Sequence, residues 1–329
     1  MNYVLTSLLP RVNCFKFISF IRNKQYGLDF IKSKLTIEFI PNFHSIFYQY
    51  FMNNIQFQSW LKAPSRTLIM GILNVTPDSF SDVREFSDSK QAAEHALKII
   101  DEGADMIDIG GESTRPGAEP VSLVDELNRT IPVIEALRQQ SECLISIDTY
   151  KSTVAKAALD AGADLVNDIS GFTFDTDMAP LVAERNVPVI LMHIKGTPRD
   201  MQKNPHYDNL MHEIVDFFNE QIAMAKKKGI HGTKIILDPG IGFGKSLEDN
   251  FEIIRELRQI CAKGYPVLLG PSRKSFIGTA LDLPVEERLE GTLASITAGV
   301  INGARIVRVH DVKETRRAVT ITEKIIGMN

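Results

Sequence analysis

The sequence has little cysteine, little net charge and no long apolar run. Only Cys14, Cys143 and Cys261 occur among 329 residues, and they lie far apart. An odd number of widely spaced cysteines predicts neither a disulfide framework nor a cysteine-based zinc site, and it favours a reducing compartment such as the cytoplasm. We expect each cysteine to be a small buried apolar residue.

The other two absences exclude further classes of protein. The formal charge is −4 at pH 7, whereas general nucleic-acid binders carry a strong basic surplus. No apolar run reaches the roughly 18 residues that a membrane helix needs. No apolar core is followed by a small-residue cleavage site, and no pair of histidines has the spacing of zinc ligands. The sequence therefore predicts no nucleic-acid partner, no membrane association and no zinc.

The first 65 residues differ in composition from the rest. They hold seven Lys or Arg against only Asp29 and Glu38, a balance of +5 that leaves −9 for residues 66–329. They are rich in Phe, Tyr, Ile and Asn and show no sustained period. We interpret 1–65 as an N-terminal extension outside the fold, with Met52 as the native start and upstream translated sequence before it. A transit peptide is the alternative, although such peptides favour Arg and Ser, and N-terminal sequencing of the native protein distinguishes the two.

From residue 66 onward, short apolar runs alternate with longer amphipathic stretches, the pattern of parallel strands joined by helices. We predict strands at 68–73, 106–109, 144–147, 165–166, 189–191, 235–237, 267–269 and 306–309. We predict helices at 91–102, 123–139, 152–160, 209–228, 247–262, 288–301 and 314–326. Eight such units in about 260 residues are typical of a (β/α)₈ TIM barrel. A doubly wound sheet is the rival, but its first strand should lead into a glycine-rich turn, which residues 74–77 do not form.

Polar side chains follow the predicted strands directly. They are Asn74, Asp108, Glu112, Asp148, Asn167, Asp168, His193, Asp238, Ser272, Arg273, Lys274, Ser275, Arg308 and His310. Catalytic groups of a TIM barrel lie at the C-terminal ends of its strands. A polar side chain next to a buried apolar run also needs a partner, so these residues are the candidate site.

Two chemistries are represented among them. Four residues can hydrogen-bond the edge of a flat, amide-rich heterocycle, because they combine acceptors with donors: Asp148, Asn167, Asp238 and Lys274. Four others suit a phosphate or diphosphate: Asn74, Arg115, Arg308 and His310. A ring-bearing diphosphate is the substrate class that this combination indicates, although spacing alone does not name it.

Structural interpretations stand beside these. Asp148 and Asp238 could cap a helix or pair with a barrel arginine, and Arg273 with Lys274 could be a solvated cationic pair. His193 is better explained as a satisfied core histidine. The segment 240–245 (GIGFGK) lacks the spacing of a phosphate-binding loop, and we interpret its glycines as allowing a ring to approach the backbone.

The motifs in this order resemble one family, the dihydropteroate synthases, which are pterin-binding TIM barrels. The matching segments are 71–82 (GILNVTPDSFSD), 108–117 (DIGGESTRPG), 147–149 (IDT), 167–169 (NDI), 238–245 (DPGIGFGK), 272–275 (SRKS) and 308–311 (RVHD). Each motif is short, but their joint order is specific. The resemblance runs from about residue 66 to the C-terminus.

The resemblance implies a transferase of folate biosynthesis, the family that sulfonamides target, and a homodimer. The reaction would condense (7,8-dihydropterin-6-yl)methyl diphosphate with 4-aminobenzoate to give 7,8-dihydropteroate and pyrophosphate. The diphosphate would leave before the amine attacks. Two alternatives remain open: a pterin-binding methyltransferase acting with a corrinoid protein, and a non-catalytic pterin-binding module.

The resemblance also assigns roles to residues. The pterin would be held by Asp148, Asn167, Asp238 and Lys274, and the diphosphate by Asn74, Thr114, Arg115, Arg308 and His310. Mg²⁺ would bridge the diphosphate and Asn74. The 4-aminobenzoate would lie among Phe80, Pro116, Phe243 and Ser275, its carboxylate at Ser275 and the exposed N–H groups of the helix that starts there. The catalytic groups would be Asp148, Lys274, Arg308 and His310.

One departure from the family pattern occurs in the first loop. The family usually has two glycines after the aspartate that matches Asp82, and this chain has Val83 and Arg84. Loss of two glycines disfavours positive φ and should stiffen the loop. We expect slower loop closure or altered 4-aminobenzoate affinity, which the kinetic constants of a Val83→Gly, Arg84→Gly double variant would reveal.

Overall fold

Eight parallel strands form the centre of the protein. The computed structural model describes residues 52–75 and 85–328. The strands are β1 (Leu68–Asn74), β2 (Met106–Gly110), β3 (Leu144–Asp148), β4 (Leu165–Asp168), β5 (Val189–Met192), β6 (Ile235–Asp238), β7 (Leu268–Leu269) and β8 (Ile306–Val309). They pair in the order β6-β5-β4-β3-β2-β1-β8-β7, and a parallel bridge from Leu237 to Val267 joins the two ends. The predicted TIM barrel is confirmed.

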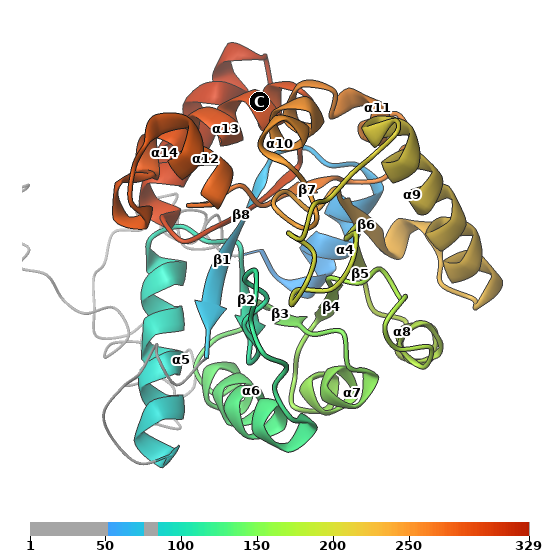
Figure 1. Cartoon of the computed structure of the whole chain (residues 1–329). Helices are drawn as coiled ribbons and strands as arrows, with labels where there is room; N and C mark the ends of the chain where they lie inside the picture. Colours follow the sequence, from blue (N-terminus) through green and yellow to red (C-terminus); the bar gives the residue numbers. More distant parts are fainter. Residues whose placement is uncertain (1–51, 76–84, 329) are drawn as a thin grey trace, which may run out of the picture. The chain divides into compact units, whose positions relative to one another are not determined.

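The helices surround this ring (Figure 1). They are α5 (Glu85–Asp101), α6 (Leu123–Arg138), α7 (Ser152–Asp160), α8 (Met178–Arg185), α9 (Leu210–Lys227), α10 (Leu247–Arg255), α11 (Arg258–Cys261), α12 (Ser275–Leu281), α13 (Leu289–Ile301) and α14 (Val312–Ile325). The stretch predicted as one helix over 247–262 is divided into α10 and α11. The spacing of apolar residues did not predict α8, because this helix has only eight residues, no side-chain cap and a proline in its first turn.

Strand residues alternate between two environments, as a period of two requires. Outward residues such as Ile107, Ile145 and Val307 pack against the helices in the main core. Inward residues at the start of each strand form a second apolar cluster that includes Met106 and Ile306. On β2, β3, β4, β6 and β8, the next inward position toward the strand C-terminus is polar. The interior is therefore apolar at one end and polar at the other.

A helix closes the apolar end and corrects the predicted domain boundary. Helix α4 (Asn54–Lys62) buries Phe57, Trp60 and Leu61 against the inward apolar side chains of the strands. Its capping box joins Asn53 and Gln56. The expectation that all of residues 1–65 lie outside the fold is thus wrong for 52–65. Three apolar contacts in nine residues are too short a pattern to indicate a helix without the barrel that buries them. Met52 as the native start stays a prediction.

Truncation of the Trp60 side chain tests whether α4 stabilises the barrel by closing its apolar end. The side chain is 4% exposed, lies 5.9 Å from Phe57 between ring centroids, and donates its Nε1–H to the Arg66 carbonyl at 2.9 Å. We expect Trp60→Ala to lower the free energy of unfolding by about 3–5 kcal/mol. Ile55→Ala on the same helix is the control, because Ile55 is 80% exposed. Equal urea midpoints for the two variants would contradict the role of α4.

Two expectations about composition can be compared with the structure. Cys143 is buried and Cys261 half-buried, and both are free thiols, whereas Cys14 lies outside the described residues. Burial raises the pKa of each of these two thiols to about 11, so they behave as apolar residues. Within residues 52–75 and 85–328, no helix combines the length and apolar character required to cross a membrane.

Candidate active site

The polar residues predicted from the strand ends meet inside the barrel mouth. Asp108, Asp148, Asn167, Asp238 and Arg308 each lie two residues after an inward apolar position on the same strand, or four in the case of Asp148. Alternation therefore points them toward the barrel axis. All four acidic or amide side chains are buried.

Arg308 is the centre of this cluster. Its Nε donates to Asp108 Oδ2 at 2.6 Å, and its Nη2 donates to Asp148 Oδ2 at 2.7 Å. The same Asp108 oxygen accepts from Asn167 Nδ2 at 3.1 Å. The alternative in which Asp148 pairs with a barrel arginine is therefore confirmed, and it is compatible with a site because only one oxygen of each carboxylate is used. Asp108, which we had noted only as a strand end, orients both Arg308 and Asn167.

The unused oxygens of this cluster define what it can bind. Asp108 Oδ1, Asp148 Oδ1 and Asn167 Oδ1 are buried and find no hydrogen-bond partner within residues 52–75 and 85–328, and the same holds for Ser146 Oγ on β3. A buried unsatisfied acceptor is destabilising by about 1–3 kcal/mol, so several in one place indicate a ligand that supplies donors. Asp238 adds a further carboxylate, whose Oδ1 accepts from the Gly240 N–H at 2.7 Å. The cluster is therefore a group of buried acceptors around the Arg308 guanidinium.

Burial shifts the pKa values of two site residues toward 7. Desolvation raises the pKa of Asp148 to about 7, with Arg308 opposing and Asp108 reinforcing the shift. Desolvation lowers the pKa of Lys274 to about 7, although the Asp238 carboxylate opposes it. Lys274 lies 4.4 Å above the Phe243 ring and donates to the Ile241 carbonyl. Both groups therefore sit where small changes of pH alter their charge.

The glycine-rich segment 240–245 packs against the end of β5. A Cβ atom at Gly240 would lie 2.1 Å from the His193 carbonyl oxygen, and one at Gly244 would lie 2.2 Å from that of Lys195. Both glycines have positive φ. The close approach is therefore to the backbone of a neighbouring loop, whereas the sequence pattern predicts the approach of a ring. At Gly242, a Cβ would lie 3.1 Å from the Lys274 side chain.

Lys245 at the end of this segment is buried and fixes it in place. It donates to the Phe243 carbonyl at 2.9 Å and to the His193 carbonyl at 3.2 Å, and it lies 3.0 Å from His193 Nδ1. His193 also packs edge-on against Phe217. The interpretation of His193 as a satisfied core histidine is confirmed. Lys245 thus holds the backbone of Phe243 near Lys274.

The corner between β7 and β8 carries the second group of predicted residues. Arg273 has φ +56° and pairs with both oxygens of Asp311, so it is not part of a solvated cationic pair. Its neighbour Lys274 is directed into the site instead. Ser272 Oγ lies 3.0 Å from His310 Nδ1. Ser275 begins α12 and is exposed, and Phe243 is half-buried.

The loop after β2 carries Thr114, Arg115 and Pro116, of which Thr114 is half-buried and the other two are exposed. The next residue, Gly117, donates its N–H to the Pro198 carbonyl at 2.9 Å. Arg115 contributes to lowering the pKa of His310, which brings its charge to the β8 corner. Phe80, Val83 and Arg84 lie outside the described residues.

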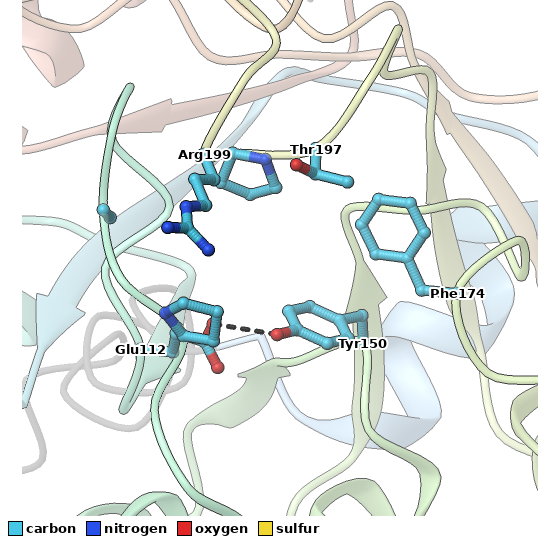
Figure 2. A pocket seen from close by; sticks show the side chains of 8 residues that line it. Glu112, Tyr150, Phe174, Thr197 and Arg199 are labelled. Atoms are coloured by element: carbon cyan, nitrogen blue, oxygen red, sulfur yellow. Dashed lines mark hydrogen bonds between the residues drawn. The ribbon is translucent and has the colours of Figure 1, made fainter.

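A separate cavity of about 220 Å³ lies beneath this loop (Figure 2). Its walls include Tyr150, Phe174 and Arg199, and Glu112 accepts the Tyr150 hydroxyl at 2.8 Å. Lys151 also donates to Glu112, so that carboxylate is already compensated. None of the unpartnered buried oxygens found among the described residues lines this cavity. The unpartnered oxygens that indicate a ligand-binding site are therefore in the barrel mouth.

Comparison with known proteins decides the family. Residues 70–310 match the family model described as "Pterin binding enzyme". The dihydropteroate synthase of Clostridium beijerinckii is 52% identical over 262 residues, which cover 79% of this chain and 95% of that protein. The chain belongs to the dihydropteroate synthase family.

Solved structures of dihydropteroate synthases share this fold. The Yersinia pestis enzyme in complex with a sulfonamide drug has a TM-score of 0.76 and 44% identity, covering 80% of this chain and 95% of that one. The Xanthomonas albilineans enzyme with 4-aminobenzoic acid has a TM-score of 0.75 and 42% identity, covering 80% and 94%. The resemblance expected from the motifs is thus confirmed, and the chain is a transferase with dihydropteroate synthase activity. The methyltransferase and the non-catalytic module are set aside.

Proposed function

We propose that this group of buried acceptors forms the pocket for the dihydropterin ring of the substrate and that the β8 corner binds its diphosphate. The observation that carries the proposal is the set of buried, unpartnered oxygens on Asp108, Asp148 and Asn167. A pterin ring carries an amino group and ring N–H groups, which supply the missing donors. Asp238 and Lys274 complete the pocket at the opposite side of the barrel mouth.

The residues of this pocket also suit the reaction. Breaking the bond between the pterin methylene carbon and the diphosphate oxygen leaves the electron pair on diphosphate and a positive charge spread over the ring. Asp148 and Asp108 would stabilise this charge, because each keeps one buried oxygen for which the described residues supply no hydrogen-bond partner. Nη1 of Arg308 donates to no described residue and is left for the departing diphosphate, which preorganised cations stabilise. The amine of 4-aminobenzoate then forms the new C–N bond and releases a proton to solvent.

Mg²⁺ is the cofactor that we propose at Asn74. The amide carbonyl of Asn74 is a hard oxygen ligand at the end of β1. Mg²⁺ prefers few protein ligands together with water and substrate phosphates. Among the described residues, no three acidic, His or Cys side chains gather into a metal site. Asn74 therefore fits a metal that the diphosphate brings with it. When bound, Mg²⁺ would neutralise charge on the leaving group.

The second substrate is proposed to bind nearer the surface. The Xanthomonas albilineans relative is known with 4-aminobenzoic acid. In this chain, Phe243 lies beside Lys274 at the pocket rim, and Ser275 follows Lys274 with its side chain exposed. Ring contact with Phe243 and Pro116, and a hydrogen bond from the Ser275 hydroxyl to the carboxylate, would place the amine toward the pterin methylene. Phe80 and Thr114 keep their predicted roles, Phe80 toward 4-aminobenzoate and Thr114 toward the diphosphate.

A coupled assay tests the proposal. The full chain and residues 52–329 would each be supplied with dihydropterin methyl diphosphate, 4-aminobenzoate and Mg²⁺, and dihydropteroate and pyrophosphate followed together. We expect each protein to form dihydropteroate and pyrophosphate in equal amounts. We also expect Mg²⁺ to bind only weakly to the protein until the diphosphate substrate is present. Pterin binding without product would contradict the proposal.

The shifted carboxyl and ammonium groups predict a pH dependence. Below about pH 7 Asp148 gains a proton and loses acceptor capacity, and above about pH 7 Lys274 loses its charge. We expect affinity for the pterin diphosphate to be greatest near pH 7 and to fall on both sides. Asp148→Asn should abolish the fall in affinity on the acid side, whereas Asp101→Asn, at an exposed carboxylate on α5, should preserve it. Calorimetric titration between pH 5 and 9 measures both.

The raised pKa of Asp148 has a second consequence, for stability. Between its ordinary value and about pH 7, the folded state keeps a proton that the unfolded state has released. Raising the pH through this window therefore favours the unfolded state. The contribution of Asp148 to the free energy of unfolding should fall from about pH 4 to 7, and Asp148→Asn should remove that slope.

We also propose a homodimer. Exposed apolar side chains concentrate in the C-terminal third of the barrel, at Leu281, Val285, Ile301, Ile321 and Ile325. They belong to α12, α13, α14 and the short turn between α12 and α13, and burial of a contiguous apolar patch formed by them would favour association. Sedimentation of the full chain tests the proposal, and a monomer at micromolar concentration would contradict it.

A further inference from the structure

His310 lies among cations at the mouth of the barrel. It follows β8 directly, is half-buried, and faces the charges of Arg308, Arg273 and Arg115, with Asp311 as the opposing carboxylate. Burial first, and then the nearby Arg308 and Arg273, lower the pKa of its imidazole to about 4. At neutral pH the ring therefore carries a single hydrogen, and the nitrogen that holds it decides what His310 can do.

Ser272 contacts His310 twice. Its Oγ accepts the backbone N–H of His310 at 3.2 Å and lies 3.0 Å from the ring Nδ1. Ser272 is 6% exposed and follows β7, so its position is set by the neighbouring strand. Among the described residues, Nδ1 is the one acceptor within hydrogen-bond distance of the Ser272 hydroxyl, so the hydroxyl hydrogen is satisfied only by donating to the lone pair of Nδ1. An imidazole that accepts at Nδ1 carries its hydrogen on Nε2.

We propose that Ser272 is a positioning residue that holds the His310 ring with its hydrogen on Nε2, directed to donate to the diphosphate of the substrate. The inference rests on the proposed function for the identity of that anion, but the ring state itself belongs to the free protein. A neutral donor keeps its hydrogen while negative charge develops on the leaving group. His310 then acts as a fixed hydrogen-bond donor beside Arg308, and it transfers no proton.

The ring state can be measured directly. Nitrogen-15 spectra of the full-length protein report which ring nitrogen of a histidine carries hydrogen, and His310→Asn assigns the signal by its loss. We expect only the Nε2–H form in the unaltered protein, a mixture of both forms in Ser272→Ala, and the Nε2–H form again in Ser272→Thr, which keeps the hydroxyl. An Nδ1–H ring in the unaltered protein, or an unchanged ring in Ser272→Ala, would overturn the proposal.

Kinetics give a second, independent readout. We expect Ser272→Ala to raise KM for the pterin diphosphate by about 10-fold, the effect of weakening one hydrogen bond to a charged group, with kcat changed less. In a His310→Asn background the same substitution should change KM by less than about twofold, because coupled residues are non-additive. Equal effects in both backgrounds would mean that Ser272 acts without His310. If no variant and no unaltered protein formed dihydropteroate, the proposed function would fail while the spectra still tested the ring state.

Discussion

Replacing Arg308 with methionine should abolish dihydropteroate formation and lower the free energy of unfolding by about 3–5 kcal/mol, the usual effect of removing one partner from a buried ion pair. The guanidinium compensates Asp108, whose side chain is fully buried, and Asp148, whose side chain is 8% exposed. Without it, two carboxylates face each other in the barrel interior. The pKa of Asp148 should rise further, since Arg308 is the charge that lowers it.

The matched control lies at the other end of the same strand. Arg305 precedes β8 and is also half-buried, and its partners in the described part of the chain are the carbonyl oxygens of Val300 and Ala304. Arg305→Met leaves no carboxylate without a partner and should preserve activity. Adding Asp108→Asn to Arg308→Met should restore part of the stability but none of the activity. Urea unfolding at pH 7 and pH 5 measures the stabilities, and a loss that does not shrink at pH 5 would contradict the electrostatic explanation.

Replacing Asp238 with asparagine should reduce kcat/KM for the pterin diphosphate by about 10³–10⁴-fold, because a site built for hydrogen bonds rejects a mismatched partner strongly. Oδ1 of Asp238 is already occupied by the Gly240 N–H at 2.7 Å. An asparagine would keep its carbonyl oxygen there and present its NH₂ group to the pocket. A donor would then meet the donor edge of the pterin.

The same substitution acts on Lys274 as well. The Asp238 carboxylate is the largest influence that keeps the pKa of Lys274 from falling further, so the ammonium should lose its proton at a lower pH in Asp238→Asn. Relative to the unaltered protein, binding of the pterin diphosphate, measured by calorimetry, should therefore weaken most just below pH 7, where only the unaltered protein keeps Lys274 charged. Asp101→Asn is the control for an exposed carboxylate. A variant with normal affinity but slow turnover would show that Asp238 acts on chemistry alone.

The prediction of this site from sequence depended on one rule of the fold. In a TIM barrel, the residue after an apolar strand faces the mouth, so Asn74, Asp148, Asn167, Asp238 and Arg308 could be grouped before any contact was known. The residue types then indicated a heterocycle and an anion. Neighbours at 2.6–2.7 Å, such as Arg308 with Asp108 and Asp148, were not predictable, because the pairing joins residues 160 and 200 positions apart.

Other parts could not be predicted because their pattern has meaning only in the assembled barrel. Helix α4 has just three buried side chains, and its partners are the inward residues of the strands. The glycines of 240–245 serve close contact with the backbone at His193 and Lys195. The local sequence of neither segment indicates which residues it contacts in the folded protein.

The sequence by itself determined the order of the eight units, the inward and outward alternation and the chemistry available at each strand end, because all three follow from local periods and residue types. The tertiary structure decided which atoms remained free to bind. It paired Arg308 with two carboxylates, left one oxygen on each without a partner, and set Ser272 against His310. These outcomes depend on distances between strands far apart in the chain, which burial and barrel closure fix and local sequence does not.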